Sequence, residues 1–351
     1  MALPKKRRIA VVCGDGHIRT IEQDVPELKA GMVLVEVESS LVSPGSEVKG
    51  WHAFSKIRND PGDPNKMKPF GYANAGTVMA VGEGVTRYSE GDRVACMGAG
   101  KAQHSDYAVV PHNLTVPLPD DVTFDQGAYA HLAATALQAL RRGDAQFGGY
   151  SAVVGLGVLG QLTAQMHQLA GCYVIGWDTV KNRLEIAKSW GIHATATVGK
   201  EDEIALTKDF TSGAGLDDAV IAFGGNADSA MASLIKCMKV SPDSHSMGVI
   251  VVVGGTKFTF GWLNNIDIRR SARTGPGYHD DPWEVGAPYP PVFMRWTTQT
   301  NLELCLRLIA EGKLKVDVLT THTLSLANID AESSEMLKNP DEVLGVVFRM
   351  K

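Results

Sequence analysis

The sequence predicts an α/β protein with two domains, one rich in β-strands and one built on a doubly wound parallel sheet. Three observations support this fold class. Short β-type runs separated by turns dominate the first 124 residues. Beyond them, apolar strands alternate with helical periodicity, and residues 150–183 contain one complete strand–turn–helix–strand unit. At 351 residues and 44% hydrophobic composition, the chain is long enough to form both domains.

The unit at 150–183 begins with a short apolar run, 152–154, which predicts a buried parallel strand. The next six residues form a G-x-G-x-x-G turn, Gly155-Leu156-Gly157-Val158-Leu159-Gly160. Apolar residues then recur at helical spacing, and a second apolar run, 173–177, ends at Asp178. This order of elements is typical of the βαβ unit of a Rossmann fold.

Each residue of the glycine turn meets a requirement of a dinucleotide site. Gly155 permits the tight turn, Gly157 lets the backbone approach a pyrophosphate, and Gly160 lets the helix lie close to the strand. Val158 and Leu159 open the helix, whose first N–H groups and positive dipole end favour phosphate groups.

Asp178 lies 18 residues past the last glycine of the turn, at the tip of the second strand. A carboxylate there accepts hydrogen bonds from the ribose hydroxyls and repels a 2′-phosphate, so the sequence predicts NAD rather than NADP. Lys181 and Arg183 keep the alternative open, because they could hold a 2′-phosphate. The turn that begins at Gly254, after the apolar run 248–253, is a further expected cofactor contact.

Composition narrows the classes of partner. A net charge of −5 and a pI near 6.1 give no reason to expect a nucleic-acid partner, and no apolar run approaches the 18 residues that a membrane span needs. The basic run 5–8 precedes an apolar stretch too short for a signal peptide, so we expect a cytoplasmic protein. The five cysteines are scattered and lack C-x-x-C spacing, which favours buried thiols over disulfides or structural zinc.

The strand and helix patterns suggest a discontinuous first domain. A helix expected at 301–311 and a final strand at 342–348 have no place in the nucleotide-binding sheet. We therefore expect residues 1–124 and 294–351 to form one domain and residues 125–293 the other. The segment 272–291 is rich in Gly, Pro and aromatic residues, and structureless segments of this length often serve as lids or binding loops.

The motifs together resemble the medium-chain dehydrogenase/reductase superfamily over essentially the whole chain. The resemblance rests on the glycine turn and on the segments 71–85, 91–94, 106–111 and 309–314. It implies a GroES-like catalytic domain, a cleft between the domains, and hydride transfer between a nicotinamide and a small-molecule alcohol or ketone. Thr135 matches the residue that lies behind the nicotinamide in the family. We also expect a homodimer or homotetramer.

The catalytic zinc of most alcohol-oxidising members of this family is not expected here. Pro44 stands where they have a cysteine ligand, Tyr72 stands where they have a histidine, and His131 alone remains as a possible third ligand. Proline cannot bind a metal, tyrosine is a poor zinc ligand, and one histidine is not a site. The family's lobe with four closely spaced cysteines is missing as well.

The segments 43–47, 275–278 and 295–297 resemble a smaller zinc-free branch, similar to the bacteriochlorophyllide-type and sugar-linked bi-domain oxidoreductases. This resemblance implies oxidation of a secondary alcohol of a sugar, cyclitol or similar polar substrate. Two alternatives stay open: an NADPH-type quinone or enoyl reductase, against which Asp178 argues, and a nucleotide-binding protein without turnover.

Alcohol oxidation without zinc requires side chains that take the hydroxyl proton and stabilise the alkoxide. The vacated metal position offers Tyr72 and His131 as base, either as a tyrosinate or as a neutral imidazole. The neighbouring turn adds three polar residues, Ser46, Glu47 and Lys49. Lys49 is expected to lower the pKa of Tyr72. If the vacated position is only packing, His279 and Asp280 of the long segment are the next candidates.

Overall fold

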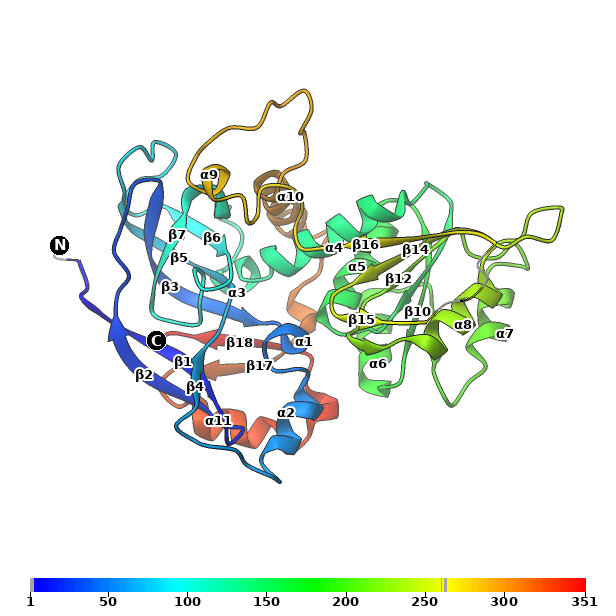
Figure 1. The fold of residues 1–351 in the computed structure, drawn as a ribbon, viewed down its shortest axis with the longest axis horizontal. Coiled ribbons are helices and arrows are strands. Elements are labelled where there is room, and N and C mark those ends of the chain that lie inside the picture. The colour runs from blue at the N-terminus through cyan, green and yellow to red at the C-terminus, as the bar shows by residue number, and fades with distance from the viewer. Residues whose placement is uncertain (1–2, 260, 262–263) are drawn as a thin grey trace. The chain divides into compact units, whose positions relative to one another are not determined.

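The computed structural model describes residues 3–259, 261 and 264–351, and these form two compact units (Figure 1). Unit 1 contains the residues up to Ala134, together with Thr274–Gly312 and Thr320–Lys351; unit 2 contains Thr135–Arg273 and Lys313–Leu319. Unit 1 is built mainly from antiparallel strands, and unit 2 from a parallel sheet with helices. The predicted fold class is therefore confirmed.

Strand β3 (Met32–Val42) organises unit 1. It pairs antiparallel with β5 (Ala73–Val81) along one edge. Along the other edge, its first half pairs with β7 (Tyr107–Pro111) and its second half with β18 (Gly345–Arg349). The sheet continues through three further strands: β6 (Arg93–Met97) and β8 (Thr115–Pro117) beyond β5, and β17 (Thr320–Ser325) beyond β18. The last strand of the chain thus joins the first unit, as the sequence suggested.

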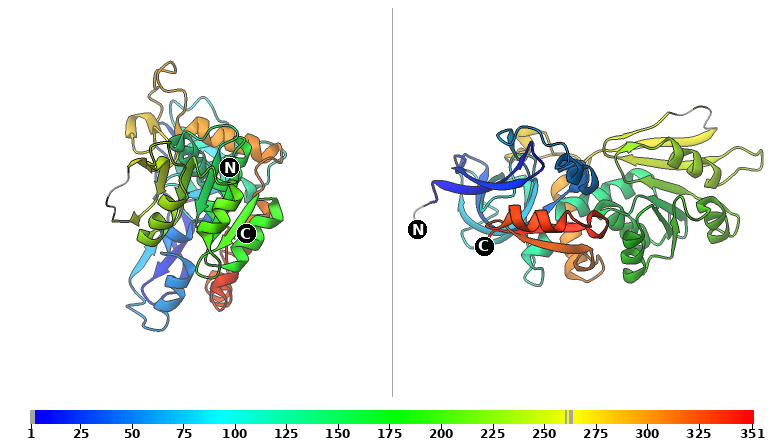
Figure 2. Two further views of the ribbon diagram at one scale, coloured as in Figure 1. Left: turned by 90° about the vertical axis from the view of Figure 1, so that its right-hand side faces the viewer. Right: turned by 90° about the horizontal axis from the view of Figure 1, so that it is seen from below.

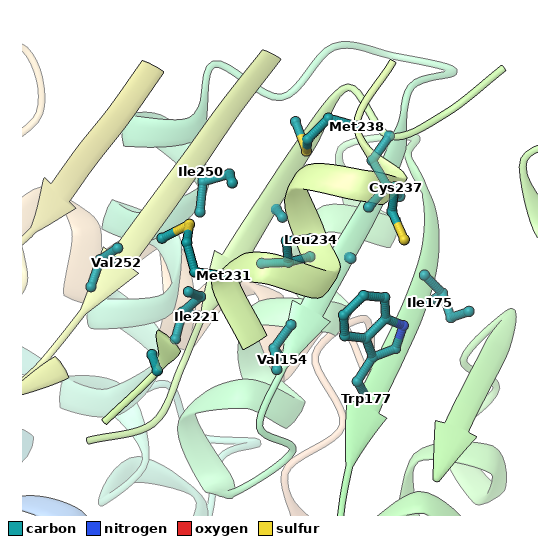
Figure 3. Close-up of a cluster of buried hydrophobic side chains, with 14 of the residues drawn as sticks. Val154, Ile175, Trp177, Ile221, Met231, Leu234, Cys237, Met238, Ile250 and Val252 are labelled. Atoms are coloured by element: carbon teal, nitrogen blue, oxygen red, sulfur yellow. The ribbon is translucent and has the colours of Figure 1, made fainter. Parts of the chain in front are cut away.

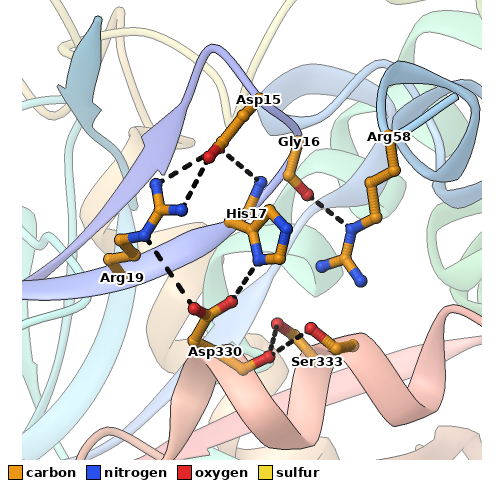
Figure 4. Close-up of polar contacts among 8 residues, drawn as sticks. Asp15, Gly16, His17, Arg19, Arg58, Asp330 and Ser333 are labelled. Atoms are coloured by element: carbon orange, nitrogen blue, oxygen red, sulfur yellow. Dashed lines mark hydrogen bonds and ion pairs between the residues drawn. The ribbon is translucent and has the colours of Figure 1, made fainter. Parts of the chain in front are cut away.

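A second, smaller sheet of unit 1 is held to a helix near the end of the chain. Its strands are β1 (Lys6–Cys13), β2 (Ile18–Asp24) and β4 (Met67–Pro69), and the helix is α11 (Ile329–Met336). At the β1–β2 turn, His17 Nδ1 lies 2.6 Å from Asp330 on α11, and Arg19 pairs with Asp15 at 2.6 Å (Figure 4). Partly exposed pairs of this kind are worth at most about 1 kcal/mol each, so they fix the turn rather than dominate stability.

Short helices surround the sheets of unit 1: α1 (Pro44–Glu47), α2 (Trp51–Ile57), α3 (Phe124–Gly127), α9 (Asp281–Glu284) and the longer α10 (Thr298–Ala310). Helix α10 begins with a capping box, in which the Thr297 hydroxyl accepts from the Thr300 N–H and the Thr300 side chain accepts from the Thr297 N–H.

Unit 2 is a doubly wound sheet with the strand order β11-β10-β9-β12-β14-β16, and each of these pairings is parallel. The strands are β9 (Tyr150–Val154), β10 (Tyr173–Asp178), β11 (Ala194–Thr197), β12 (Asp218–Ile221), β14 (Met247–Val253) and β16 (Asn265–Ser271). Numbered along the chain, this is the 3-2-1-4-5-6 order of the Rossmann fold. The strand order reverses between β9 and β12, and the glycine turn follows β9, the position where such sheets bind ligands.

Alternate residues of these strands face two different sets of helices. Residues such as Val154, Ile175, Trp177 and Ile221 pack against α7 (Glu203–Phe210) and α8 (Asp228–Cys237), as Figure 3 shows for the α8 side. On the other face, Val220, Val251 and Val253 pack with Ala139 of α4 (Ala130–Gly143) and with Leu159 of α5 (Val158–Leu169). Figure 2 shows the sheet and its helices from two further sides. The near-continuous apolar strands follow from burial on both faces.

The division between the units falls elsewhere than the sequence suggested. Residues 274–293 belong to unit 1 rather than to the nucleotide-binding domain. Their contacts explain this: Asn113 Nδ2 donates to the carbonyl of Trp283 at 2.6 Å, and the Ala99 N–H donates to the Tyr278 hydroxyl at 2.7 Å. Residues 313–319 belong to unit 2, since the side chain of Gln165 both donates to and accepts from the Lys315 backbone. The first boundary lies within α4, ten residues past the expected position 124.

None of the helices in the described part of the chain combines the length and the hydropathy that a membrane crossing requires. The five cysteines are buried, as their scattered positions suggested.

Candidate functional site

The turn α1 presents polar side chains at the place where zinc-dependent relatives carry a ligand. It begins at Pro44, whose fixed φ suits the first position of a helix. The Glu47 side chain folds back over the turn, and its Oε2 accepts the Ser43 N–H at 2.6 Å. The Glu47 side chain is only 4% exposed, whereas Ser46 is exposed. The turn therefore carries a buried carboxylate beneath an accessible hydroxyl.

Tyr72 is the residue immediately before β5. Gly71 has φ +112°, and a Cβ there would lie 2.4 Å from the backbone nitrogen of His104, so this position requires glycine. The Tyr72 carbonyl accepts the Gly98 N–H at 3.0 Å. Its ring packs against the ring of His131, with centroids 4.5 Å apart. Two residues far apart in sequence, which we predicted to share the vacated metal position, are thus neighbours in unit 1.

The Tyr72 hydroxyl remains protonated at neutral pH. Burial raises the pKa of Tyr72 well above its usual value of 10, and the nearby Glu47 raises it further. Hydrogen bonds with the Ser43 and Ser46 side chains act in the opposite direction but do not offset these two causes. The structure therefore contradicts a tyrosinate base, and Tyr72 can act instead as a hydrogen-bond donor.

Lys49 does not have the role that the sequence suggested. It is exposed, it adopts a positive φ of 59°, and it is not among the groups that shift the pKa of Tyr72. The expected lowering of that pKa by a lysine is wrong: the pKa is raised.

His131 is a neutral imidazole in this environment. It lies in the first turn of α4 and is 8% exposed, and burial lowers its pKa to about 3. A neutral ring can orient a neighbour or accept a hydrogen bond, but a group with this pKa is a weak proton acceptor near pH 7. Tyr72 and His131 together form an uncharged site next to the carboxylate of Glu47.

The low pKa of His131 predicts an acid-sensitive unit 1. In the unfolded chain His131 takes up a proton near pH 6.5, whereas in the folded chain it does so only near pH 3. Protonation below pH 6.5 therefore favours the unfolded chain. The free energy of unfolding is highest above pH 6.5 and decreases as the pH falls below that value. This loss amounts to about 2 kcal/mol between pH 7 and pH 5. Denaturant unfolding at both pH values measures it, and His131→Phe should remove that part of the pH dependence. An unchanged pH dependence in the variant would contradict the shift.

Tyr278 is a site residue that the sequence motifs contained but did not single out. Its hydroxyl accepts the Ala99 N–H at 2.7 Å, one residue from the Gly98 that bonds to Tyr72, and Tyr278 also contributes to the raised pKa of Tyr72. The two residues of the same segment that we considered as candidates are engaged elsewhere: the His279 ring stacks on Tyr278, and the Asp280 carboxylate caps α9 and accepts from the hydroxyl of Tyr289.

Among the residues that the structure describes, no three His, Cys, Asp or Glu side chains gather in a group that could hold a metal ion. Pro44 and Tyr72, the two positions at which the sequence suggested a lost ligand, are among the described residues. Around these positions the side chains offer the hydroxyls of Ser43, Ser46 and Tyr72 and the imidazole of His131.

In unit 2, the glycine turn has the geometry that a dinucleotide requires. Gly155 has φ +91°, and a Cβ on Gly160 would lie 1.8 Å from the carbonyl oxygen of Gly155. A Cβ on Gly157 would meet nothing within 4 Å, which leaves open space above the turn. Gly157 is the N-cap of α5 and has no side chain to occupy the first N–H groups, including those of Val158 and Leu159. These observations fit a bound pyrophosphate.

Asp178 ends β10 and ties the glycine turn to the following loop. Its Oδ2 accepts the Leu156 N–H at 2.6 Å and its Oδ1 accepts the Val180 N–H at 2.8 Å. Each carboxylate oxygen can accept about two hydrogen bonds; Oδ2 also accepts from Arg183, so the remaining capacity for a ribose hydroxyl is at Oδ1. Arg183 Nη1 lies 3.5 Å from Oδ2, so the basic residue that could hold a 2′-phosphate is next to this carboxylate. Thr135 is buried on α4, and Gly254 follows β14 with φ +78°.

Two family models match the chain: the alcohol dehydrogenase GroES-like domain at residues 29–120 and the zinc-binding dehydrogenase domain at residues 158–282. Mouse sorbitol dehydrogenase is 30% identical over 72% of this chain and 77% of its own length. Among solved structures, an Escherichia coli oxidoreductase/dehydrogenase of unknown specificity has a TM-score of 0.78 at 21% identity, covering 99% of each chain. An alcohol dehydrogenase of E. coli in complex with NADH has a TM-score of 0.71 at 17% identity, covering 99% of this chain and 100% of the other.

These matches and the two-unit fold establish the class: the chain belongs to the medium-chain dehydrogenase/reductase superfamily. The family is one of oxidoreductases that use nicotinamide cofactors, and the glycine turn and Asp178 lie where such a cofactor binds in this fold.

Proposed function

We propose that the protein is a zinc-independent, NAD-dependent dehydrogenase that interconverts a secondary alcohol and a ketone on a sugar, a cyclitol or a similar polar molecule. The observation that carries the proposal is the Tyr72 side chain, which stands in place of a metal ligand, packs on the His131 ring with centroids 4.5 Å apart and keeps its hydroxyl protonated beside Ser43 and Ser46. A spectrophotometric screen of polyols and their ketones with NAD and with NADP tests it, because turnover changes the nicotinamide absorbance. Turnover with neither class of substrate would overturn the proposal.

A nicotinamide held at the glycine turn would supply or accept the hydride. The side chains of unit 1 bind the reacting oxygen and exchange its proton. In the reducing direction the Tyr72 O–H donates a hydrogen bond to the substrate carbonyl and gives its proton as negative charge develops there, while Ser46 replaces that proton from water, so that no free tyrosinate forms. In the oxidising direction the alcohol proton leaves by the reverse path, to the Tyr72 oxygen as the Tyr72 proton passes through Ser46 to water, while the hydride goes to the nicotinamide. A hydrogen bond to a charged oxygen is worth about 1.5–3 kcal/mol, a useful part of what a metal ion would contribute.

Ser43 and Ser46 connect the Tyr72 hydroxyl to the surface, because Ser43 is buried and Ser46 is exposed. A proton that leaves Tyr72 can therefore be replaced through the exposed serine. Glu47 opposes ionisation of Tyr72 and so favours its return to the protonated state.

The preference for NAD rests on Asp178, whose carboxylate lies at the end of β10 with capacity for a ribose hydroxyl. The polar substrate class rests on the hydroxyls of Ser46, Tyr72 and Tyr278, and on the similarity to a sorbitol dehydrogenase. Hydroxyl groups of this kind suit a substrate that itself carries several hydroxyls, since each polar group of the site can then find a hydrogen-bond partner on the substrate.

We expect the purified protein to contain no stoichiometric zinc and to keep its activity in the presence of a chelator. Pro44 cannot bind a metal and Tyr72 is a poor ligand, so one imidazole is left at the position. Elemental analysis measures the metal content directly, with a zinc-dependent alcohol dehydrogenase as the positive control. About one zinc per chain, lost together with activity on chelation, would overturn zinc independence.

A further inference from the structure

A buried histidine faces the buried glutamate of the α1 turn. His104 Nε2 lies 3.4 Å from Glu47 Oε1, and the two side chains are 0% and 4% exposed. Neither of these two atoms has a hydrogen-bond partner among the described residues. Burying a carboxylate without a neighbouring polar group costs folding free energy. The His104 ring is such a neighbour for Glu47, and the Glu47 carboxylate is one for His104.

The His104 ring is held firmly on its other sides. Its Nδ1 lies 2.7 Å from the Ser40 hydroxyl on β3, within hydrogen-bond distance. The rings of Phe70 and Phe348 meet it at centroid distances of 4.6 and 4.9 Å, both in edge arrangements. The His104 N–H donates to the Phe70 carbonyl at 3.2 Å, and its carbonyl accepts the Ala10 N–H at 2.8 Å. These contacts therefore fix the position of the His104 ring beside Glu47.

The Glu47 side chain connects the fixed His104 ring to the α1 turn of the candidate site. One oxygen faces His104, and the other accepts the Ser43 N–H at 2.6 Å, which fixes the start of α1. The side chains of Ser43 and Ser46, at the start of this turn, lie beside the Tyr72 hydroxyl and influence its pKa. A continuous line of contacts thus runs from the core of unit 1, through His104 and Glu47, to the hydroxyl that we propose to hold the reacting oxygen.

We propose that His104 is a positioning residue for Tyr72: it anchors the Glu47 carboxylate and thereby keeps the α1 turn where its serines hold the Tyr72 hydroxyl. This inference rests on the proposed function, because the position of Tyr72 matters for turnover only if Tyr72 contacts the substrate oxygen. Without His104 the carboxylate has no buried counter-group and turns toward water, which breaks its bond to Ser43. A displacement of about 1 Å in a reacting group can cost roughly a hundredfold in rate.

The test compares His104→Phe, Glu47→Gln and the double variant in crystal structures and in steady-state kinetics. Phenylalanine fills the space between Phe70 and Phe348 but offers nothing to Glu47. We expect Ser46 to move away from the Tyr72 hydroxyl in His104→Phe, with kcat lowered by about 10- to 100-fold and the KM for NAD unchanged. A neutral glutamine needs no counter-charge and still accepts the Ser43 N–H, so the double variant should recover much of the lost kcat.

The matched control is His17→Phe, which removes a histidine paired with a carboxylate, Asp330, elsewhere in the same unit (Figure 4). It should leave kcat unchanged. If His104→Phe does not fold, His104→Met gives the same comparison, and His104→Gln, which restores an N–H toward Glu47, should retain activity.

Three results would overturn the inference: an unmoved Tyr72 in the structure of His104→Phe, wild-type turnover in that variant, or a double variant no more active than His104→Phe. Failure of the proposed function is distinguishable, since it would appear as absent turnover in the wild-type protein. In that case the crystal structures still report whether loss of His104 moves Tyr72 and whether Glu47→Gln restores its position.

Discussion

Replacing Tyr72 with phenylalanine should lower kcat by about 10²- to 10⁴-fold, the usual contribution of a positioned acid or base. The variant removes the one hydroxyl that burial and Glu47 keep protonated and that Ser43 and Ser46 hold in place. The variant leaves the glycine turn and Asp178 intact, so NAD affinity should stay nearly unchanged. Steady-state kinetics, together with NAD titration monitored by fluorescence, separates the two effects.

Tyr88→Phe is a matched control for Tyr72→Phe. Tyr88 is another buried tyrosine of unit 1 with a raised pKa, and its hydroxyl donates to the carbonyl of Thr115. Its loss should cost about 1 kcal/mol of stability and no turnover. Near wild-type kcat in Tyr72→Phe, or an equal loss in Tyr88→Phe, would show that the vacated metal position is only packing.

Replacing Asp178 with serine should weaken NAD binding by roughly ten- to a hundredfold and improve the use of NADP. Loss of the hydrogen bond from a ribose hydroxyl to the carboxylate costs about 1.5–3 kcal/mol, and the repulsion toward a 2′-phosphate disappears with the charge. Arg183, 3.5 Å from the carboxylate, is then available to the phosphate. The ratio of kcat/KM values for the two cofactors measures the change.

Asp178 also accepts the backbone N–H groups of Leu156 and Val180, so its loss could loosen the turn. Asp178→Asn controls for this, because the amide oxygen still accepts one of these bonds while the charge is gone. Arg183→Leu in the Asp178→Ser background should remove the gain with NADP. If the cofactor ratio stays constant across these variants, Asp178 does not contact the ribose.

Local patterns in the sequence were sufficient to predict the βαβ unit that organises unit 2. The glycine turn, the helical spacing after it and the apolar run ending at Asp178 lie within 34 consecutive residues, 150–183, and each element is recognisable without knowledge of its partners. The structure has the expected strands and the Rossmann strand order. The assignment of residues 274–293 to unit 1 was harder to predict. An irregular segment has no hydrophobic period, and its contacts, such as the one with Asn113, are made with residues distant in sequence.

The proximity of Tyr72 and His131 was predictable from the sequence, but their chemistry was not. Resemblance to the family indicated that Tyr72 and His131 share one place, and their rings are in contact. The direction of their pKa shifts depends on burial, which only the folded chain defines. The raised pKa of Tyr72 argues against a tyrosinate base and against the expected effect of Lys49. His104 carried no signal in the sequence, because its pairing with Glu47 joins residues 57 positions apart.

The central claim is that a tyrosine hydroxyl, rather than a metal ion, holds the reacting oxygen. A crystal structure of the protein with NAD and a bound secondary alcohol or its ketone tests this most directly. We expect Tyr72 Oη at hydrogen-bond distance, roughly 2.6–3.2 Å, from the oxygen on the carbon that faces nicotinamide C4. A metal ion bound to that oxygen, or an oxygen held by other side chains with Tyr72 out of reach, would contradict the account.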